Sequence, residues 1–304
     1  MSRIDIGRGL AVAVACVSAV AALAGSAGAT FPGRNGRIAF GSNRRGSFEI
    51  YSMKPGGTGV VRLTHNSTDD FSPSYSPNAK KIAFVNEPSP TNDEIRIMNA
   101  DGTHNHALTH TPTVFDDDPS FGPNGKIAFD SEPLGGTEQI FVMDADGSHQ
   151  HALTHASDAS FEPGFSPTGR RIAFTRNLSG NNEVFVMRAD GTHQRNVTNN
   201  PADDSNPQFS PNGRKIVFSS DRGTGSSDIY VMDADGSHVH RLTKTADADV
   251  TPAFSPDGKR IVFERSPAIG TSELVVMDAD GSHKHALTHT RTSIQNNDPD
   301  WGVG

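Results

Sequence analysis

Residues 252–263 read Pro-Ala-Phe-Ser-Pro-Asp-Gly-Lys-Arg-Ile-Val-Phe, and variants of this stretch recur along the chain. Each copy combines a Pro/Gly turn with a short apolar run. The run consists of a basic residue, Ile, Ala or Val, and Phe, and it returns every 44 or 45 residues. The six runs begin at Arg37, Lys81, Lys126, Arg171, Lys215 and Arg260. Such a repeat indicates an architecture built from equivalent units.

The rest of each unit is typical of β-strands. A second apolar run ending in Met leads to an Asp-Gly turn (Gly56-Gly57 in the first copy), a short Leu-Thr or Val-Thr run and a Pro-x-aromatic segment. Runs of four to six residues rich in Ile, Val and Phe, bounded by turn residues, favour strands. Asp-Gly suits a hairpin turn that needs positive φ. We expect the repeated methionines in the core, and these are Met53, Met98, Met143, Met187, Met232 and Met277.

Four short strands in a repeating unit of about 45 residues are typical of a β-propeller. We therefore predict an all-β fold, a six-bladed β-propeller of four-stranded antiparallel blades. The sixth Pro-x-aromatic segment lies at the C-terminus, where Trp301 takes the place of Phe or Tyr. We expect this C-terminal strand to complete the N-terminal blade, which begins at Gly36. The ring would then be closed and would have no open edges.

The first 29 residues have the pattern of a secretory signal. Arg3 and Arg8 precede an apolar run over residues 10–24, and small residues follow as far as Ala29. This order is typical of a cleaved leader, and the run is shorter than the roughly 20 residues of a membrane span. We predict a cleaved signal peptide over 1–29 and a propeller over 30–304. The protein is then exported, either periplasmic or secreted, without stable membrane insertion after cleavage.

Composition excludes several classes of function. The formal net charge of −8 disfavours binding to the backbone of a nucleic acid. The one cysteine, Cys16, lies in the predicted leader, which excludes a disulfide scaffold and a Cys-based zinc site. The sequence also lacks the common motifs of hydrolases, metalloproteases and nucleotide-binding enzymes. We therefore expect a monomeric protein that is not an enzyme.

Acidic residues gather just upstream of the Pro-x-aromatic segments. If these segments are the innermost strands, the acidic residues surround the mouth of the central tunnel and attract a cation or a basic segment. An alternative is that an Asp three residues before Pro satisfies loop amides through its side chain. The candidate partner-binding residues at this tunnel mouth are Asp70, Asp116, Asp117, Asp204, Asp249 and Asn296.

The unit at 252–263, followed by residues 273–277, Asp278-Ala279-Asp280-Gly281 and Leu287-Thr288, closely resembles the TolB-like, WD40-like repeat known as PD40. The copy at 207–243 matches nearly every family position. The resemblance implies the six-bladed propeller found in the C-terminal part of TolB, without the N-terminal domain of that protein. It also implies a protein of an export compartment that acts through protein contacts.

Four histidine pairs in i, i+2 spacing project from one face of an extended segment. The resemblance places them next to the outermost strand, where we expect them to be solvated. A firm zinc site needs three or four protein ligands, so no metal site is predicted. The pairs are the candidates for a weak metal site or a pH response, and they are His104, His106, His149, His151, His238, His240, His283 and His285.

We predict a non-enzymatic, exported propeller that binds a protein or peptide of the cell envelope through the tunnel-mouth loops. It needs no cofactor. One alternative is a metal-dependent carbohydrate-active enzyme, hydrolase or lyase that uses tunnel carboxylates and a divalent cation at the tunnel mouth. A second alternative is a His-rich metal-binding or pH-responsive surface protein.

Overall fold

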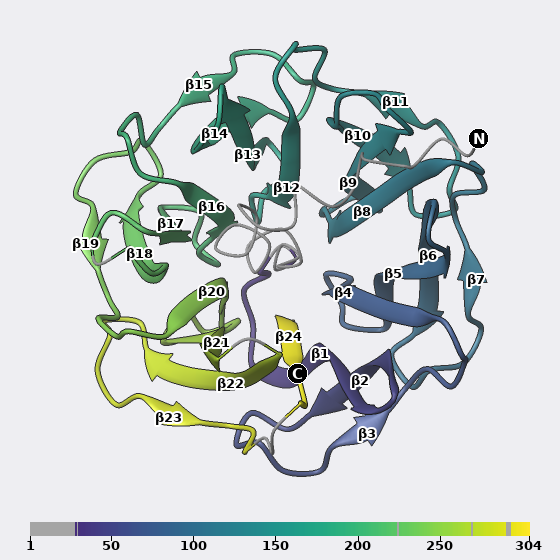
Figure 1. Ribbon diagram of the computed structural model, residues 1–304, viewed down its shortest axis with the longest axis horizontal. Helices are drawn as coiled ribbons and strands as arrows, with labels where there is room; N and C mark the ends of the chain where they lie inside the picture. Colours follow the sequence, from purple (N-terminus) through teal and green to yellow (C-terminus); the bar gives the residue numbers. More distant parts are fainter. Residues whose placement is uncertain (1–27, 29, 224, 269, 290–292) are drawn as a thin grey trace, which may run out of the picture.

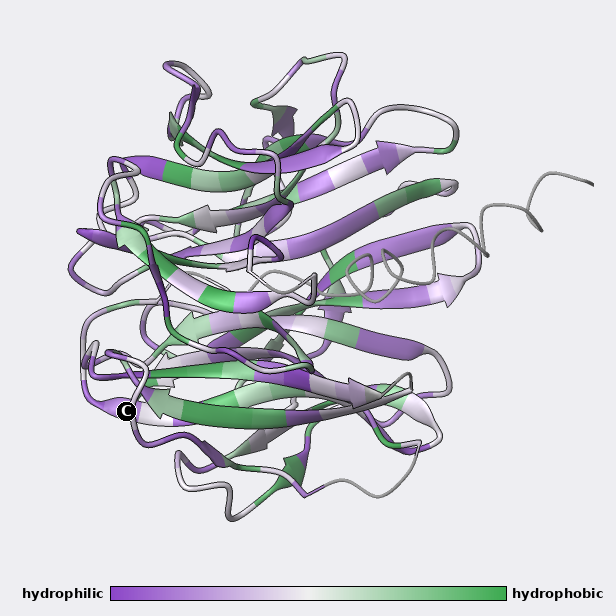
Figure 2. Ribbon diagram, turned by 60° about the vertical axis from the view of Figure 1, so that its left-hand side comes forward, coloured by the Kyte–Doolittle hydropathy of each residue, from purple (hydrophilic) through white to green (hydrophobic). Residues whose placement is uncertain are grey.

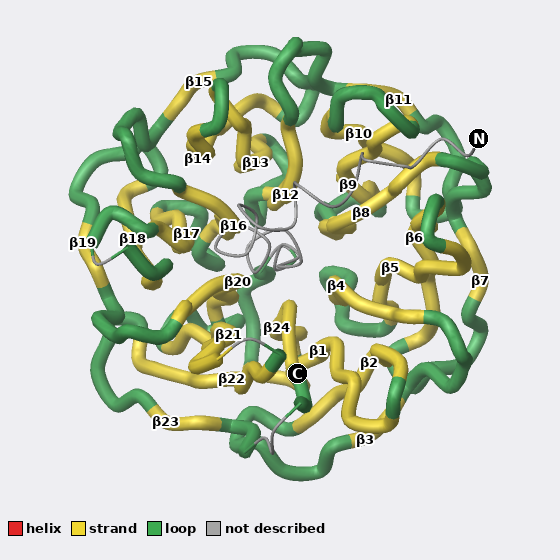
Figure 3. The backbone as a smooth tube through the Cα atoms, in the orientation of Figure 1, coloured by secondary structure: helices red, strands yellow, loops and turns green. Residues whose placement is uncertain are grey.

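The computed structural model describes residue 28 and residues 30–223, 225–268, 270–289 and 293–304, and it arranges them as strands around a ring (Figure 1). All 24 elements in these residues are β-strands joined by loops and turns (Figure 3). The all-β class is confirmed. The described residues contain no helix with the length and apolarity of a membrane span.

Four sheets have four strands each. One follows the order β24(Asn296–Val303), β1(Asn35–Arg45), β2(Ser47–Met53), β3(Val61–Arg62). Another consists of β12(Ser160–Phe165), β13(Arg171–Leu178), β14(Asn181–Arg188) and β15(Arg195–Asn196). The third consists of β16(Asp204–Phe209), β17(Lys215–Ser220), β18(Asp228–Asp233) and β19(His240–Arg241). The fourth consists of β20(Ala248–Phe254), β21(Arg260–Ala268), β22(Thr271–Asp278) and β23(His285–Ala286).

The remaining eight strands form one continuous sheet. Its first half contains β4(Asp69–Tyr75), β5(Lys81–Ser89), β6(Asn92–Asn99) and β7(His106–Ala107). Its second half contains β8(Val114–Phe121), β9(Lys126–Pro133), β10(Gln139–Asp144) and β11(His151–Ala152). The halves are joined where β6 pairs in parallel with β8, with Asp93 opposite Phe115.

The prediction of six separate four-stranded blades is therefore wrong: four blades have this form, and the other eight strands make a single sheet. The cause is the length of β8. It begins at Val114, five residues before Pro119, whereas β16 begins at Asp204, three residues before Pro207. The additional residues of β8 reach the start of β6 and pair with it.

The C-terminal strand completes the N-terminal sheet, as expected. β24 lies against β1, with Trp301 opposite Ile38 and Asn296 opposite Ser42 (Figure 1). Trp301 is 2% exposed. The first and last strands of the described fold are thus held in one sheet, which leaves no open edge at their junction.

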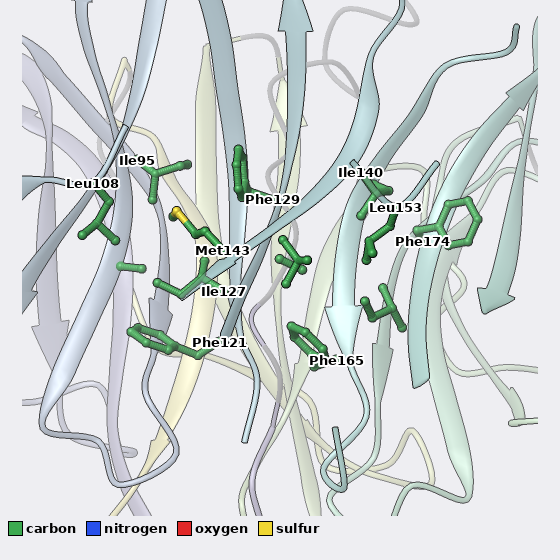
Figure 4. Packing of buried hydrophobic residues seen from close by; sticks show 14 of the residues in the cluster. Ile95, Leu108, Phe121, Ile127, Phe129, Ile140, Met143, Leu153, Phe165 and Phe174 are labelled. Atoms are coloured by element: carbon green, nitrogen blue, oxygen red, sulfur yellow. The ribbon is translucent and has the colours of Figure 1, made fainter. Parts of the chain in front are cut away.

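The core lies within and between neighbouring sheets. Phe121, Phe165 and Met143 belong to the largest cluster of buried apolar side chains (Figure 4). Apolar bands cross the strands, while the connecting loops are mostly hydrophilic (Figure 2). The predicted core position of the methionines is confirmed, because all six are at most 1% exposed. Their flexible side chains fill the space between stacked sheets.

The predicted leader lies outside the described residues except for Gly28. The carbonyl oxygen of Gly28 accepts a hydrogen bond from Nε2 of Gln208 on β16. After the predicted cleavage point, Thr30 donates through Oγ1 to the carbonyl oxygen of Phe254, at 3.2 Å. Phe31 is buried in the largest core cluster. Residues on both sides of position 29 therefore contact the propeller.

Candidate functional site

The strands β4, β8, β12, β16, β20 and β24 surround the centre of the ring (Figure 1). Each contains Pro, and the residue before it is a buried, non-glycine residue with φ between 47° and 55°. Register shifts in all six strands mark β-bulges at these positions. A non-glycine residue with positive φ has a strained backbone, and the surrounding structure must compensate for that strain. The residues are Ser72, Asp118, Glu162, Asn206, Thr251 and Asp298.

These bulges connect neighbouring sheets through hydrogen bonds. Ser72 donates through Oγ to Oδ1 of Asp118, at 3.1 Å. Asn206 donates to Glu162 twice, through its backbone amide at 2.7 Å and through Nδ2 at 2.6 Å. The buried carboxylates at the centre of the ring therefore help to fix the order and spacing of the sheets.

Two of the predicted tunnel-mouth residues form buried ion pairs. Asp204 accepts two hydrogen bonds from Arg222, at 2.7 and 2.6 Å. Arg222 uses Nη2 for both of these bonds, whereas Arg265 donates to Asp249 through Nε and Nη2, at 2.7 and 2.9 Å. Both carboxylates are 0% exposed. Such two-point pairing fixes the strand that carries the arginine against the innermost strand.

Three further predicted residues are also buried and hydrogen-bonded. Asn296 accepts through Oδ1 from Arg44, at 2.6 Å. Asp70 accepts from Asn86 at 2.6 Å, and Asp116 accepts from Ser131 at 2.6 Å. The structure thus brings local donors to these side chains. Their part in partner binding stays a prediction.

Asp117, the remaining predicted residue, has a different environment. Its Oδ1 atom is buried and makes no hydrogen bond with any described residue. It lies near Asp93, Asp130 and Glu138, and Glu138 in turn lies near Glu162; the sequence did not single out any of these four carboxylates. We call the five together the acidic group: Asp93, Asp117, Asp130, Glu138 and Glu162.

Burial raises the pKa of every member of the acidic group, and neighbouring carboxylates raise it further. The pKa of Asp93 rises to about 7 and that of Glu162 to about 8, first because of burial and then because of nearby negative charge. Burial also raises the pKa of Glu138 to about 7, and a hydrogen bond with Asp130 partly opposes this rise. The pKa values of Asp117 and Asp130 lie well above the ordinary range.

None of the five forms an ion pair with a described residue. Elsewhere in the ring, arginines at the end of the strand next to the innermost one supply positive charge: Arg44, Arg176, Arg222 and Arg265. Arg44 and Arg222 stand four residues after the Phe of their strand, and Arg176 and Arg265 stand two residues after it. The two halves of the eight-stranded sheet have no arginine at either position: they have Pro88 and Pro133 at the first and Asn86 and Ser131 at the second. A comparison of the copies at these two positions would have pointed to the region from the sequence.

The acidic group lies where the sheet departs from the repeat. Asp93 is the residue that pairs with Phe115 to join the two halves. Asp117 is two residues further along β8, and Glu138 precedes β10 in the connection that begins after Pro133. Oδ1 of Asp93 is buried and makes no hydrogen bond with any described residue. This end of the sheet therefore concentrates carboxyl groups that pair with no basic side chain of the described residues, and each becomes negatively charged only as the pH rises through its raised pKa.

The paired histidines lie on exposed hairpins. In three pairs, Nδ1 of the first ring is 2.8 Å from a carboxylate of the same hairpin, for example His149 from Asp144. Nδ1 of His151 lies 2.9 Å from the carbonyl oxygen of His149. Within the described residues, no three His, Cys, Asp or Glu side chains are grouped so as to hold a metal ion.

Comparison with known proteins identifies the family. The family model for the TolB beta propeller domain, PD40, matches residues 21–161 and 150–302. The chain belongs to the PD40 family. The resemblance expected from the repeats is thus confirmed. No curated protein sequence matches the chain.

Several solved structures share the fold of this chain. TolB from Acinetobacter baumannii superposes with a TM-score of 0.77 at 20% identity, covering 88% of this chain and 67% of that one. A putative TolB from Agrobacterium tumefaciens gives 0.71 at 20% identity, covering 83% and 88%. An oligogalacturonate lyase in complex with manganese gives 0.54 at 15% identity, covering 83% and 89%. Identities this low show a common fold alone.

Proposed function

We propose that this PD40 propeller is an exported, non-enzymatic binding protein whose partner is a protein or peptide of the cell envelope with positively charged side chains. The observation that supports the proposal is the acidic group. Burial and neighbouring carboxylates raise the pKa of all five carboxyls, and no described residue forms an ion pair with them. Carboxyl groups without an ion-pair partner favour a cationic partner, which stabilises their negatively charged form in a partly desolvated site.

The surroundings of the acidic group suit contact with a macromolecule. Glu138 ends the connection between β9 and β10, which also contains Leu134. Leu134 is 58% exposed, the highest value among the large apolar side chains described as exposed. An exposed apolar side chain in the same connection as Glu138 offers a partner contact area in addition to charge complementarity. We place the binding surface at this end of the eight-stranded sheet.

Titration with defined peptides tests the proposal. The probe is a capped peptide with four basic residues separated by Gly and Ser, and the reference peptide has Gln at the basic positions. We expect the basic peptide alone to bind, with an affinity that rises from pH 6 to pH 8 as the carboxyls lose protons. The double variant D117N/E138Q should weaken binding about tenfold or more.

The matched control is D146N/D280N, which removes the same charge from exposed hairpins. It should bind the basic peptide within about twofold of the wild type. If both double variants lose the same affinity for the basic peptide, the loss comes from the change in net charge alone, and the proposed binding surface is overturned. N-terminal sequencing of the exported protein should begin at Thr30 if the predicted leader is cleaved.

The enzymatic alternative has its own measurement. The protein is incubated with oligogalacturonate and Mn²⁺, and unsaturated products are followed by their ultraviolet absorbance. We expect no turnover. Cleavage that stops with a chelator and returns with Mn²⁺ would replace the binding proposal with a metal-dependent lyase activity.

A further inference from the structure

In three sheets, one guanidinium group lies over two neighbouring aromatic rings. The distances from the guanidinium carbon to the ring centroids are between 4.7 and 5.3 Å. This is the range of a cation–π interaction. The three arrangements are Arg44 over Phe40 and Tyr51, Arg176 over Phe174 and Phe185, and Arg222 over Phe218 and Tyr230.

Each of these arginines also reaches the polar residue three positions before Pro on the innermost strand. Arg222 binds Asp204, Arg44 binds Asn296, and Arg176 donates to Ser160. The fold therefore has a recurrent receptor for a guanidinium group. It consists of two neighbouring aromatic rings, inclined to each other by 26° to 34°, and one hydrogen-bond acceptor.

The second half of the eight-stranded sheet has the same two parts. Phe129 and Phe141 face each other across β9 and β10, with centroids 5.8 Å apart and planes inclined by 36°. The pair Phe174–Phe185 has values of 5.6 Å and 34°. Asp116 takes the position of Asp204, because it lies opposite Ser131 as Asp204 lies opposite Ser220.

The arginine itself is missing from this half. The sequence reads Ser220-Asp221-Arg222 where the guanidinium is present, and Ser131-Glu132-Pro133 at the equivalent place. No guanidinium of a described residue lies over Phe129 or Phe141. Phe141 is only half-buried, whereas the equivalent Tyr230 is 5% exposed beneath its arginine.

A pair of aromatic rings without an arginine is not found in the described residues of the two remaining parts of the ring, which are the first half of the eight-stranded sheet and the sheet of β20 to β23. In the first half of the eight-stranded sheet, Arg96 lies opposite Phe84, so no ring pair forms there. In the sheet of β20 to β23, Arg265 lies over Phe263, which faces Val275. Among the described residues, Phe129 and Phe141 form the one ring pair of this kind without an arginine.

We propose that Phe129, Phe141 and Asp116 form a receptor for an arginine side chain supplied by a partner, and we call it open because no arginine of the described residues fills it. Phe141 is its accessible part, since Phe129 is 1% and Asp116 is 3% exposed. The incoming guanidinium stacks first on Phe141, and it reaches Phe129 and the carboxylate of Asp116, which Ser131 now holds at 2.6 Å, by displacing the atoms that cover them. Arginine fits better than lysine because a planar guanidinium stacks on aromatic rings and donates several hydrogen bonds in fixed directions. The inference rests on the proposed function in that it names a side chain of the basic partner.

An NMR titration with a capped Gly-Gly-Arg-Gly-Gly peptide tests the receptor, and the same peptide with Lys serves as the comparison. We expect the Arg peptide to shift resonances of Phe141 and its neighbours, and to bind several-fold more tightly than the Lys peptide. The variant P133R restores the Ser-x-Arg pattern of 220–222 and fills the receptor from within. It should abolish Arg-peptide binding. F141L should weaken that binding about tenfold, while F185L, in a receptor already filled by Arg176, should leave it unchanged.

A variant that loses peptide binding could simply be misfolded, so a second variant is designed to gain a binding site. R222A empties the equivalent receptor over Phe218 and Tyr230, so the Arg peptide should then occupy two sites. The inference is overturned if P133R binds the Arg peptide as the wild type does, or if Arg and Lys peptides bind equally and F141L has no effect. In that second case, a loss of binding in D117N/E138Q would still support the broader proposal of a basic partner.

Discussion

The Oδ2 atom of Asp300 accepts a hydrogen bond of 2.7 Å from the backbone amide of Tyr75, although the two residues are 225 positions apart in the chain. The contact joins β24 to β4, the innermost strands on either side of the place where the described chain closes on itself. Asp300 is 1% exposed, and its Oδ1 atom has no hydrogen-bond partner among the described residues. A buried carboxylate with this environment makes the stability of the closed ring dependent on pH.

Burial raises the pKa of Asp300 from 3.8 to about 7. The folded protein therefore holds this proton more tightly than the unfolded chain, and stability is lost as the pH rises from about 4 through 7. We expect D300N, which keeps an acceptor for the Tyr75 amide, to be more stable than the wild type at pH 8 by about 1–4 kcal/mol. At pH 4 the two proteins should be nearly equal.

Urea unfolding at both pH values measures this difference. The control is D280N, which alters an exposed carboxylate whose pKa is lowered by hydrogen bonds from Ser282. It should not reproduce the gain at pH 8. A D300N protein with the pH profile of the wild type would contradict the assigned cause.

Trp301 tests the closure of the ring. It is buried opposite Ile38 in the strand pairing of β24 and β1, and Arg260 lies 5.0 Å from its ring centroid. We expect W301A to lower the free energy of unfolding by about 3–5 kcal/mol through loss of buried surface and a new cavity. W301F restores the aromatic residue of the other copies and should cost much less.

Deletion of 296–304 removes the whole strand and exposes the edge of β1. We expect this protein to lose its cooperative thermal transition and to aggregate, because unpaired strand edges recruit other chains. A deletion variant that melts at the temperature of the wild type would contradict the closure.

We expect the histidine hairpins to bind Zn²⁺ only weakly. His149 is 77% exposed at its side chain, and its Nδ1 atom already contacts Asp144. The structure offers two imidazoles per hairpin where a firm zinc site needs three or four ligands. Calorimetric titration with micromolar Zn²⁺ should give no saturable binding. Stoichiometric uptake that H149A/H151A reduces would instead favour the His-rich alternative.

The strands were predictable because they repeat. Six equivalent runs identify the elements, and Trp301 in the position of Phe or Tyr indicates how the last strand pairs with β1. The eight-stranded sheet was not predictable in the same way. It depends on Val114 and Phe115, which extend β8 toward Asp93, and the repeat pattern does not include these positions.

The candidate site was only partly predictable. The sequence singled out Asp117, but burial of Asp93 and Asp130 depends on how neighbouring sheets stack, which no local pattern encodes. The partners of Asp204 and Asp249 lie 18 and 16 residues downstream, on or just after the adjacent strand. An alignment of the copies against one another, with attention to Pro133 in the place of Arg222, contains the signal for the open receptor.

The ion pair of Arg222 and Asp204 provides a test of the filled receptor. The arginine side chain is 21% exposed and the carboxylate is fully buried. Removing Arg222 leaves a buried charge without its partner, so we expect R222A to lower the free energy of unfolding by about 2–4 kcal/mol. The double variant R222A/D204N should recover part of this loss, because the amide needs no counterion.

Chemical unfolding of the wild type, both single variants and the double variant measures the coupling between the two residues. The control is K126A, which breaks the exposed pair of Lys126 and Asp144 and should cost less than about 1 kcal/mol. If the losses of the two single variants simply add, or if R222A costs no more than K126A, Arg222 is not the stabilising partner of Asp204. Arg222 would then not stabilise its receptor, and there would be no energetic reason to expect a partner's arginine to bind the equivalent receptor near Pro133.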